Sequence, residues 1–266
     1  EFDGITISGE WALGEGCNPD ARILYFHGGG FTVGSARSHR AVTAQLARRT
    51  GCAVFAPDYR LMPENSRMDT IVDARAAYRA ILQMGPNGPA PVKALAVGGD
   101  SAGANLSLMI AAWARDEKLR AADAVFVFSV PTDATATSPS IRANFETDIM
   151  LKPLVAPMLK VPPILLRPMI YKATGIKPND PMVSPVFGDL SNLPPTLMQV
   201  SQAEMLFDDS VRYARKAQKS GSVVTLQSWE HVPHVWHMFD EHLEEADEAL
   251  SEVEKFLRRN MKLNSR

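Results

Sequence analysis

The feature that most constrains the fold is a Gly-Xaa-Ser-Xaa-Gly pentapeptide at residues 99–103, placed between two runs of different character. The apolar residues 94–97 before it predict a buried strand, and residues 104–115 after it predict a helix. A serine on so tight a turn adopts a strained backbone and needs small neighbours, since a side chain there would collide with crossing segments. The turn lifts the Ser101 hydroxyl out of the sheet and leaves helical amides free to donate to an anion. We therefore predict that Ser101 is a nucleophile.

Apolar runs that predict strands alternate with helical patterns along most of the chain. The predicted strands are residues 5–8, 22–26, 52–56, 94–97, 124–130, 196–200 and 223–229, and the predicted helices are 38–50, 69–84, 104–115, 208–220 and 239–260. This alternation favours an α/β fold with a mostly parallel central sheet flanked by helices on both faces. In such a sheet the catalytic groups gather at the carboxyl ends of the strands.

The alternation lapses from about residue 134 to residue 180. This stretch is apolar, rich in Met and Leu, and interrupted by prolines. We predict that it is a small cap inserted after the sixth core strand, within a single catalytic domain that covers residues 1–266.

Ser101 needs an imidazole within hydrogen-bond reach, because a serine hydroxyl is a weak nucleophile until a base takes its proton. Three histidines follow the last predicted strand, and among His231, His234 and His237 we predict that His234 is the base. Their spacing of three also raises a zinc site as an alternative, which is less favoured because no carboxylate or cysteine cluster accompanies them. The remaining histidines have other predicted roles: His27 shapes the loop after its strand, and His39 and His242 are solvated.

The acid that orients the base should follow the strand at residues 196–200. Glu204 is the first carboxylate after that strand, so we predict that it holds the imidazole tautomer. Asp208 and Asp209 are interpreted as charges in the first turn of the next helix, and Asp133 is the second choice of acid. The resulting order of serine, acid and histidine is that of an α/β-hydrolase.

Several motifs together resemble the hormone-sensitive-lipase family of bacterial esterases. They are His27-Gly28-Gly29-Gly30, Tyr59-Arg60-Leu61-Met62-Pro63-Glu64, Gly99-Asp100-Ser101-Ala102-Gly103, Asp180-Pro181 with Ser184-Pro185, and His234-Val235-Trp236. The resemblance implies an α/β-hydrolase fold and ester hydrolysis through an acyl-enzyme. It also implies an oxyanion hole made by amides of Gly28, Gly29 or Gly30, with Gly29 and Gly30 favoured, together with that of Ala102. It implies no metal and no organic cofactor, and it suggests a homodimer formed by pairing of edge strands.

Two features depart from the family pattern. The usual acid is an aspartate, whereas Glu204 occupies that place here. Members also carry N-terminal helices that help to cap the site. This chain starts with Glu1, close to its first predicted strand, so we expect those helices to be absent or truncated.

An apolar pocket next to Ser101 would suit short- to medium-chain acyl or aryl esters. The residues predicted to line it are Phe31, Val33, Asp100, Leu206 and Trp236, with Met150, Leu151 and Ile170 from the cap. Alternatively, several of them only pack the cap against the sheet. Two other functions stay open: an amidase or formamidase with the same serine chemistry, and a non-catalytic receptor on the same scaffold.

Composition excludes some partners. A formal net charge of -2 gives no reason to expect nucleic acid or an anionic membrane. No signal peptide is visible, and the apolar residues 154–170 are broken by four prolines, so we expect no integral membrane segment. The two cysteines, Cys17 and a buried Cys52, are too few for a disulfide framework, which favours a reducing, cytoplasmic location.

Overall fold

The computed structural model describes residues 4–239 and 242–263, and its central element is a seven-stranded sheet. The strand order is β1-β3-β2-β6-β7-β8-β9, and every neighbouring pair is parallel except β1 with β3. The strands of the sheet are β1 (Gly9–Ala12), β2 (Asn18–Phe26), β3 (Cys52–Pro57), β6 (Ala94–Asp100), β7 (Ala124–Phe128), β8 (Thr196–Ser201) and β9 (Val224–Trp229). A separate two-stranded ribbon consists of β4 (Met84–Gly85) and β5 (Gly88–Pro89).

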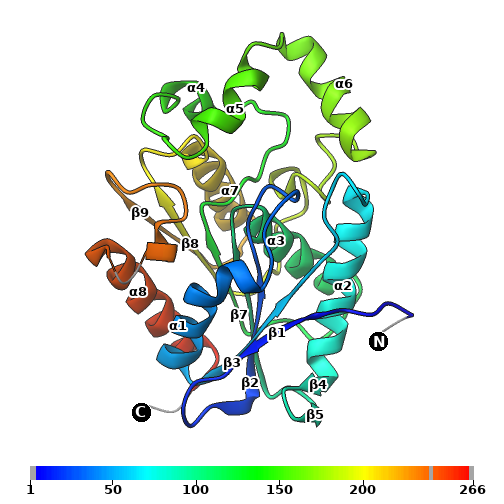
Figure 1. Cartoon of the computed structure of the whole chain (residues 1–266), viewed down its shortest axis with the longest axis vertical. Coiled ribbons are helices and arrows are strands. Elements are labelled where there is room, and N and C mark those ends of the chain that lie inside the picture. The colour runs from blue at the N-terminus through cyan, green and yellow to red at the C-terminus, as the bar shows by residue number, and fades with distance from the viewer. Residues whose placement is uncertain (1–3, 240–241, 264–266) are drawn as a thin grey trace.

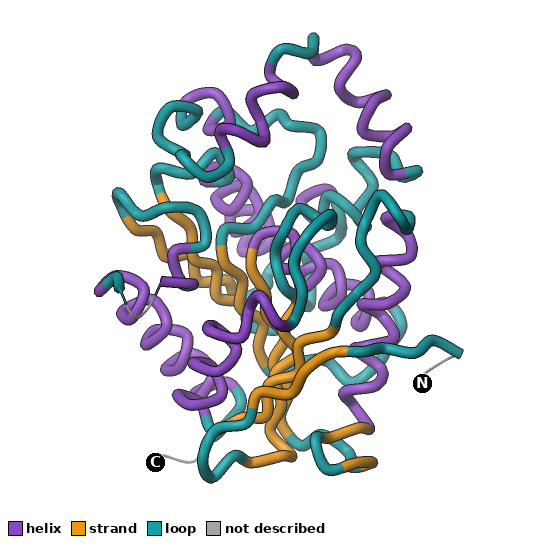
Figure 2. The backbone as a smooth tube through the Cα atoms, in the orientation of Figure 1, coloured by secondary structure: helices purple, strands orange, loops and turns teal. Residues whose placement is uncertain are grey.

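Helices cover both faces of this sheet (Figures 1 and 2). They are α1 (Arg40–Thr50), α2 (Arg67–Gln83), α3 (Ser101–Asp116), α4 (Ser140–Ala143), α5 (Lys152–Leu159), α6 (Pro163–Thr174), α7 (Phe207–Lys219) and α8 (Glu244–Asn260), with 3-10 helices η1 (Arg37–His39), η2 (Pro185–Phe187) and η3 (Trp236–Phe239). On one face α1 and α8 pack Leu46 and Leu250 onto the strands, whereas α2, α3 and α7 cover the other. Burial of the strands on both faces explains their continuous apolar runs. The predicted α/β-hydrolase architecture, a mostly parallel sheet flanked by helices, is confirmed.

Two predicted elements are wrong in position. The first strand covers residues 9–12 rather than 5–8, and it pairs antiparallel with β3 so that Gly9 lies opposite Pro57. A side chain at Gly9 would lie 2.3 Å from the Ala56 carbonyl oxygen, so the glycine permits this close pairing. The last helix begins at Glu244 rather than at residue 239, because the backbone first turns in η3.

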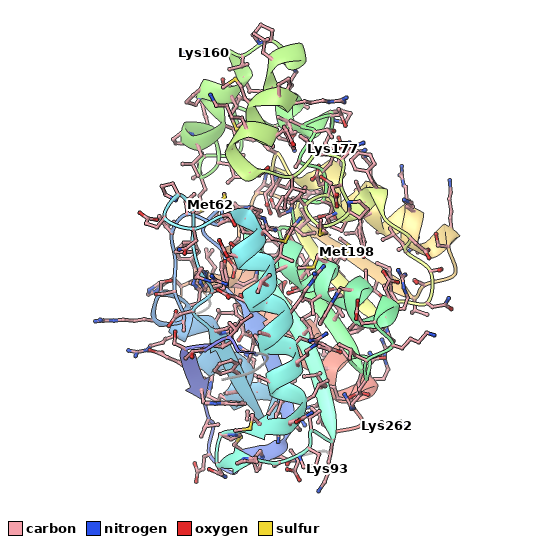
Figure 3. The ribbon with its side chains drawn as sticks, turned by 90° about the vertical axis from the view of Figure 1, so that its right-hand side faces the viewer. Met62, Lys93, Lys160, Lys177, Met198 and Lys262 are labelled. Carbon is pink, nitrogen blue, oxygen red and sulfur yellow. The ribbon has the colours of Figure 1, made fainter. Side chains whose placement is uncertain are left out.

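The 134–180 segment contains α4, α5 and α6 and lies above the carboxyl ends of the strands (Figure 1). It follows β7, which is the fifth strand of the described sheet in chain order, one fewer than predicted. Figure 3 places Lys160 of this segment at one end of the molecule and Lys93 and Lys262 at the other. The helices therefore add a layer on the edge of the sheet where the functional side chains were expected.

Candidate active site

Ser101 lies on the sharp turn between β6 and α3, and its backbone φ is +47°. Two glycines allow the turn, because the end of β2 crosses directly behind it. A Cβ atom on Gly103 would lie 1.9 Å from the Phe26 carbonyl oxygen, and one on Gly99 would lie 2.4 Å from the same atom. No side chain fits at that separation, so the pentapeptide is explained by packing against β2.

Ser101, His234 and Glu204 form a continuous hydrogen-bonded chain. The Ser101 Oγ lies 3.0 Å from His234 Nε2, and His234 Nδ1 lies 2.7 Å from Glu204 Oε2. His234 and Glu204 are buried, with 6% and 1% of their surfaces exposed. The structure thus brings together the residues predicted as nucleophile, base and acid, each from a loop at the carboxyl end of a strand.

The carboxylate of Glu204 is held by groups that the sequence did not single out. Its Oε1 accepts from the Ser129 hydroxyl and from the Ser201 amide, both at 2.8 Å. The Ser129 oxygen in turn accepts from the amide of Val235, next to His234, at 3.1 Å. Ser129 follows β7 immediately and adopts a φ of +51°. The sequence feature that could have indicated this role is a polar residue, Ser129, directly after a fully apolar strand.

The environment of His234 favours the imidazolium that a general base must form. Burial alone would lower the pKa of His234, but the charge of Glu204 and its hydrogen bond outweigh that effect. More distant charges, on Asp148 and Asp100, act in the same direction. The pKa of His234 is therefore raised above its ordinary value.

Not all of the glycine loop can donate to an oxyanion. The Gly28 amide donates to Asp100 Oδ1 at 3.1 Å and faces His39 Nε2 at 3.3 Å, so its inclusion among the donors was wrong. Gly29 and Gly30 have positive φ angles, and in the described part of the chain neither amide donates a hydrogen bond. Ala102 is the second residue of α3, where backbone amides have no partner within a helix.

Asp100, the residue before the serine, holds this loop in place. Its carboxylate accepts from the Tyr25 hydroxyl at 2.8 Å and lies 3.3 Å from His39 Nε2. Burial raises the pKa of Asp100, but the hydrogen bonds from His39 and Tyr25 outweigh it and keep that pKa below its ordinary value. Burial likewise lowers the pKa of His39, and the hydrogen bond to Asp100 reverses the shift. The prediction that His39 is solvated was wrong, because this buried carboxylate is its partner.

The other histidines have separate surroundings. His27 bonds the Gly28 carbonyl oxygen at 2.7 Å, as predicted for a loop-shaping residue. His237 stacks on Phe128, and burial lowers its pKa to about 3. The His231 side chain is 93% exposed and faces Glu230. His231, His234 and His237 therefore do not converge, and among residues 4–239 and 242–263 no group of histidine, cysteine and acidic residues is arranged to hold a metal ion.

Two other acids have structural partners instead. Asp133, the second choice of acid, pairs with Arg212 at 2.7 Å and accepts from the hydroxyls of Thr135 and Thr137. Asp208 and Asp209 lie in the first turn of α7, as predicted. The sequence did not indicate that Asp209 is also buried, where it accepts from the amides of Thr132 and Asp133.

A cavity of about 410 Å³, which we call the serine cavity, opens beside Ser101 and His234. Seven apolar residues line it: Val33, Met150, Leu151, Leu154, Val235, Met238 and Phe239. Asp100 also reaches it, as predicted.

Four predicted lining residues lie elsewhere. Trp236 is fully buried against α8 and donates to the Glu245 carbonyl oxygen, so it cannot line an open cavity. Phe31 lies under the Arg67 guanidinium, 3.8 Å from it, and Leu206 precedes α7. Ile170 of α6 is also absent from the walls.

A family model described as the alpha/beta hydrolase fold matches residues 23–238. The chain belongs to this family. It is 33% identical to an esterase from Acinetobacter venetianus, over 88% of this chain and 73% of that protein. It is 34% identical to an acetyl-hydrolase from Streptomyces hygroscopicus, over 96% of this chain and 82% of that protein.

Solved structures give the same assignment. An esterase of the bacterial hormone-sensitive lipase family superposes with a TM-score of 0.83 at 32% identity, over 96% of this chain and 82% of that one. The esterase EstE5, from a crystal soaked with p-nitrophenyl butyrate, superposes with a TM-score of 0.84 at 33% identity, over 98% and 83%. The resemblance to the hormone-sensitive-lipase family is therefore confirmed. No helix in the described ranges has the length and apolarity that a bilayer crossing requires.

Proposed function

We propose that this α/β-hydrolase is a serine carboxylesterase that cleaves esters of short to medium acyl chain length through an acyl-enzyme. The observation that carries the proposal is the chain Ser101–His234–Glu204, which opens into an apolar cavity beside the glycine loop. Relatives named as esterase, acetyl-hydrolase and ethyl acetate hydrolase support an ester as the substrate.

The first half of the reaction forms the acyl-enzyme. Ser101 Oγ attacks the ester carbonyl carbon while its proton passes to His234 Nε2. The negative charge that develops on the carbonyl oxygen accepts hydrogen bonds from the amides of Gly29, Gly30 and Ala102. The carbon–oxygen bond to the alcohol then breaks, and the alcohol leaves with the proton from His234.

The second half regenerates the enzyme. A water molecule gives its proton to His234 and attacks the acyl carbon, and the carboxylic acid leaves as Ser101 recovers the proton. Glu204 keeps its negative charge throughout. It holds Nδ1 of His234 protonated, so that Nε2 faces the serine, and it stabilises the imidazolium of each step.

The walls of the serine cavity support the substrate class. Val33 comes from the glycine loop, whereas Met150, Leu151 and Leu154 come from the 134–180 segment. We therefore propose that this segment acts as the cap that closes over the acyl group. A volume of about 410 Å³ lies in the range of small-molecule sites, which favours short and medium acyl chains over long ones.

The test is hydrolysis of p-nitrophenyl butyrate by the wild type, Ser101→Ala and the control Ser220→Ala on the exposed end of α7. We expect Ser101→Ala to lose at least about 10⁴-fold in kcat with an unchanged circular dichroism spectrum, and the control to retain full activity. Retained turnover in Ser101→Ala would overturn the proposal. Faster turnover of the matching anilide than of the ester would reassign the enzyme to the amidases.

Assembly and location are separate proposals. A homodimer would pair edge strands, and β1 and β9 are the edges of this sheet. A mass of two chains by light scattering is the expected result. A cytoplasmic location is proposed because two cysteines are too few for a disulfide framework, and fractionation of cells that produce the protein tests it.

A further inference from the structure

The loop that carries Glu204 is held by the first part of the 134–180 segment. We call residues 202–205 the acid loop and residues 140–148 the clasp. Four consecutive carbonyl oxygens of the acid loop accept hydrogen bonds from side chains of the clasp. Asn144 Nδ2 donates to those of Gln202 and Glu204 at 2.8 and 2.7 Å, the Thr147 hydroxyl to that of Ala203 at 2.9 Å, and the Ser140 hydroxyl to that of Met205 at 2.7 Å.

The peptide group that follows Glu204 is fixed at both of its polar ends. Its carbonyl oxygen accepts from Asn144, and its N–H, which belongs to Met205, donates to Asp148 Oδ2 at 2.9 Å. Asp148 is buried, with 3% of its surface exposed, so little water competes for this charge-assisted hydrogen bond. Because a peptide group is planar, two residues of the clasp set the orientation of this one.

The peptide group that precedes Glu204 is held in a similar way. The Thr147 hydroxyl donates to its oxygen, on Ala203, and the Glu204 amide donates to the Ser201 carbonyl oxygen at 3.2 Å. With both flanking planes fixed, the φ and ψ of Glu204 are fixed as well, and these angles direct its side chain toward His234. Three of the four contacts come from the clasp, and the fourth comes from the end of β8.

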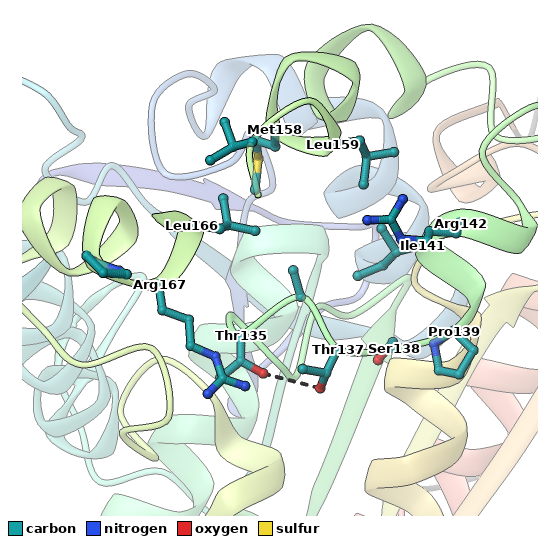
Figure 4. Close-up of a pocket in the computed structure, with 13 residues that line it drawn as sticks. Thr135, Thr137, Ser138, Pro139, Ile141, Arg142, Met158, Leu159, Leu166 and Arg167 are labelled. Carbon is teal, nitrogen blue, oxygen red and sulfur yellow. Dashed lines mark hydrogen bonds between the residues drawn. The ribbon is translucent and has the colours of Figure 1, made fainter. Parts of the chain in front are cut away.

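The clasp also continues into a wall of the serine cavity. The second oxygen of Asp148 accepts from the amide of Leu151 at 2.9 Å, and Leu151 lines that cavity. Farther out, a cavity of about 670 Å³ lies between α4 and α6, with Arg142 on one side and Arg167 on the other (Figure 4). The contacts of the clasp with the acid loop, rather than with α6, therefore fix its position.

Asp148 also acts on the base through its charge. Burial alone would lower the pKa of His234, whereas the charge and hydrogen bond of Glu204 and the charges of Asp148 and Asp100 raise it. Asp100 belongs to the turn of the nucleophile, and Asp148 belongs to the clasp. Loss of the Asp148 carboxylate would therefore release the acid loop and also weaken the stabilisation of the imidazolium.

We propose that Asn144 and Asp148 are positioning residues for the catalytic acid. They fix the peptide group after Glu204 so that its carboxylate meets His234 Nδ1, and Asp148 joins this group to the wall of the serine cavity. The segment proposed as the cap is thus also part of the machinery that orients the triad. The inference rests on the proposed function, because it needs Glu204 to orient His234 during turnover.

Asn144→Ala tests the clasp without changing a charge. We expect kcat for p-nitrophenyl butyrate to fall about tenfold with KM nearly unchanged, because the acid is displaced and the cavity wall is not. A weaker bond from Glu204 lowers the pKa of His234, so the acidic limb of kcat/KM should move to lower pH. The control is Asn260→Ala at the end of α8, which removes a similar bond, from Nδ2 to the Phe256 carbonyl oxygen at 2.8 Å.

Asp148→Asn removes the charge and one of the two amide contacts, since the new side chain has a single oxygen. We expect kcat to fall about tenfold or more, and KM to rise because Leu151 of the cavity wall is released. The acidic limb should move farther to lower pH than in Asn144→Ala. The matched control is Asp123→Asn, whose carboxylate accepts from the Leu95 amide at 2.7 Å beside the amino ends of β6 and β7.

A milder variant guards against misfolding. Thr147 is exposed, and Thr147→Val keeps the shape of the side chain and removes its bond to the Ala203 carbonyl oxygen. We expect kcat to fall about twofold to threefold, with the acidic limb again at lower pH. Circular dichroism and urea denaturation report the folded fraction of every variant.

Labelling of Ser101 by phenylmethanesulfonyl fluoride needs no ester. Ser101 Oγ bonds to the sulfur, fluoride leaves and His234 takes the proton. Labelling should slow about tenfold in Asn144→Ala and Asp148→Asn. Slower labelling of these variants, with a wild type that is labelled but cleaves no ester, would reject the proposed function and keep the positioning role. Wild-type protein that is neither labelled nor active would reject both.

Three outcomes would overturn the positioning role and keep the proposed function. The first is ester hydrolysis as fast in folded Asn144→Ala and Asp148→Asn as in the wild type. The second is an equal loss of rate in Asn260→Ala and Asp123→Asn. The third is a slower rate with an unmoved acidic limb, which would mean that the clasp only stabilises the fold.

Discussion

The strand-end turns that carry Ser101, His234 and Glu204 differ in construction from the 134–180 segment above them. The turns are fixed by close packing, since Gly103 touches the backbone of β2. In the 134–180 segment, by contrast, α5 buries none of its residues and Leu154 is 70% exposed. Buried polar side chains anchor that segment instead of an apolar core. The difference indicates that the reacting groups have one fixed geometry, whereas the cavity walls can change shape at little cost to the fold.

The largest predicted effect is on unfolding free energy, when a methyl group is added to a glycine of the strand-end turns and, for comparison, to a glycine of the 134–180 segment. Gly103→Ala places a Cβ 1.9 Å from the Phe26 carbonyl oxygen, so we expect a loss of about 3 kcal/mol or more of unfolding free energy. Gly175→Ala, at the end of α6, meets no atom of the described residues within 4 Å. Its cost is the strain of a φ of +71°, about 1 kcal/mol. Urea denaturation measures both. Equal losses would contradict the contrast between the two regions.

Within the strand-end region, Glu204→Gln should have the largest effect on catalysis. The glutamine amide can donate to His234 Nδ1 and so favour the wrong tautomer, and we expect kcat to fall about 10³- to 10⁴-fold with little change in stability. Because the charge of Glu204 raises the pKa of His234, its loss lowers that pKa. The acidic limb of kcat/KM, below which the base is protonated, should therefore move to lower pH.

Two controls accompany this variant. Glu230→Gln removes an exposed acid from the same end of the sheet and should be neutral. Asp133→Asn tests the alternative acid and should leave the pH profile of kcat/KM unchanged, because Asp133 bonds Arg212 rather than His234. If Asp133→Asn lost activity like Glu204→Gln, the assignment of the orienting acid would be wrong.

The sequence predicted the strand-end region well, because its residues follow local rules. Ser101 comes directly after a strand, and Glu204 and His234 lie in the loops that follow β8 and β9. Because catalytic groups gather at these strand ends, position along the chain indicates position in space. The errors concern partners that are distant in sequence. His39 looked solvated because its partner, Asp100, lies 61 residues away. Trp236 was predicted in the pocket because aromatic residues suit both pockets and cores, and only the packing of α8 decides.

The 134–180 segment was predictable only as a lapse in the strand–helix alternation. Its helices are short, and Pro157 and Pro168 lie inside them, so periodicity gave no boundaries. The polar anchor Asp209 was missed for a related reason. An acid in the first turn of a helix usually stabilises the helix dipole, and nothing local shows that Thr132 and Asp133 donate to it.

Asp209 is the next test, since it anchors the 134–180 segment to α7. Burial raises the pKa of Asp209 to about 6, above its ordinary 3.8. The folded state therefore holds a proton that the unfolded state lacks, and the stability this gives below pH 3.8 is lost as pH rises through 6. Asp209→Asn removes that dependence and keeps an oxygen for the two amides.

The unfolding free energy of Asp209→Asn minus that of the wild type should rise by about 2 kcal/mol when the pH is raised from 4 to 7. Urea titrations at the two pH values measure this change. Asp116→Asn, at the exposed end of α3, is the control and should show no such trend. A difference that is the same at both pH values would mean that Asp209 is not protonated in the folded protein at pH 4.

The smallest predicted effect concerns Arg67, which lies between the glycine loop and the 134–180 segment. Arg67 is buried, and its guanidinium lies over Phe31, which follows Gly30 and has a φ of +64°. Its Nη2 donates to Asn105 Oδ1 at 3.0 Å, and Asn105 Nδ2 donates to the carbonyl oxygens of Pro131 and Val183, just outside the two ends of the 134–180 segment. One buried cation therefore supports both the glycine loop and that segment.

Arg67→Met should lower kcat about tenfold with KM nearly unchanged, because Phe31 loses its stacking partner and the Gly29 and Gly30 amides lose their fixed direction. The unfolding free energy should change by less than about 1 kcal/mol, since the described residues offer this buried charge no carboxylate and burial already lowers its pKa to about 10. Arg67→Lys should not restore kcat, because an ammonium group lacks the planar face. Arg75→Met, on the same helix over Trp113, is the control. If the fall in kcat were explained entirely by loss of folded protein, Arg67 would have a structural role only. The geometry of the glycine loop would then come entirely from its packing against β2.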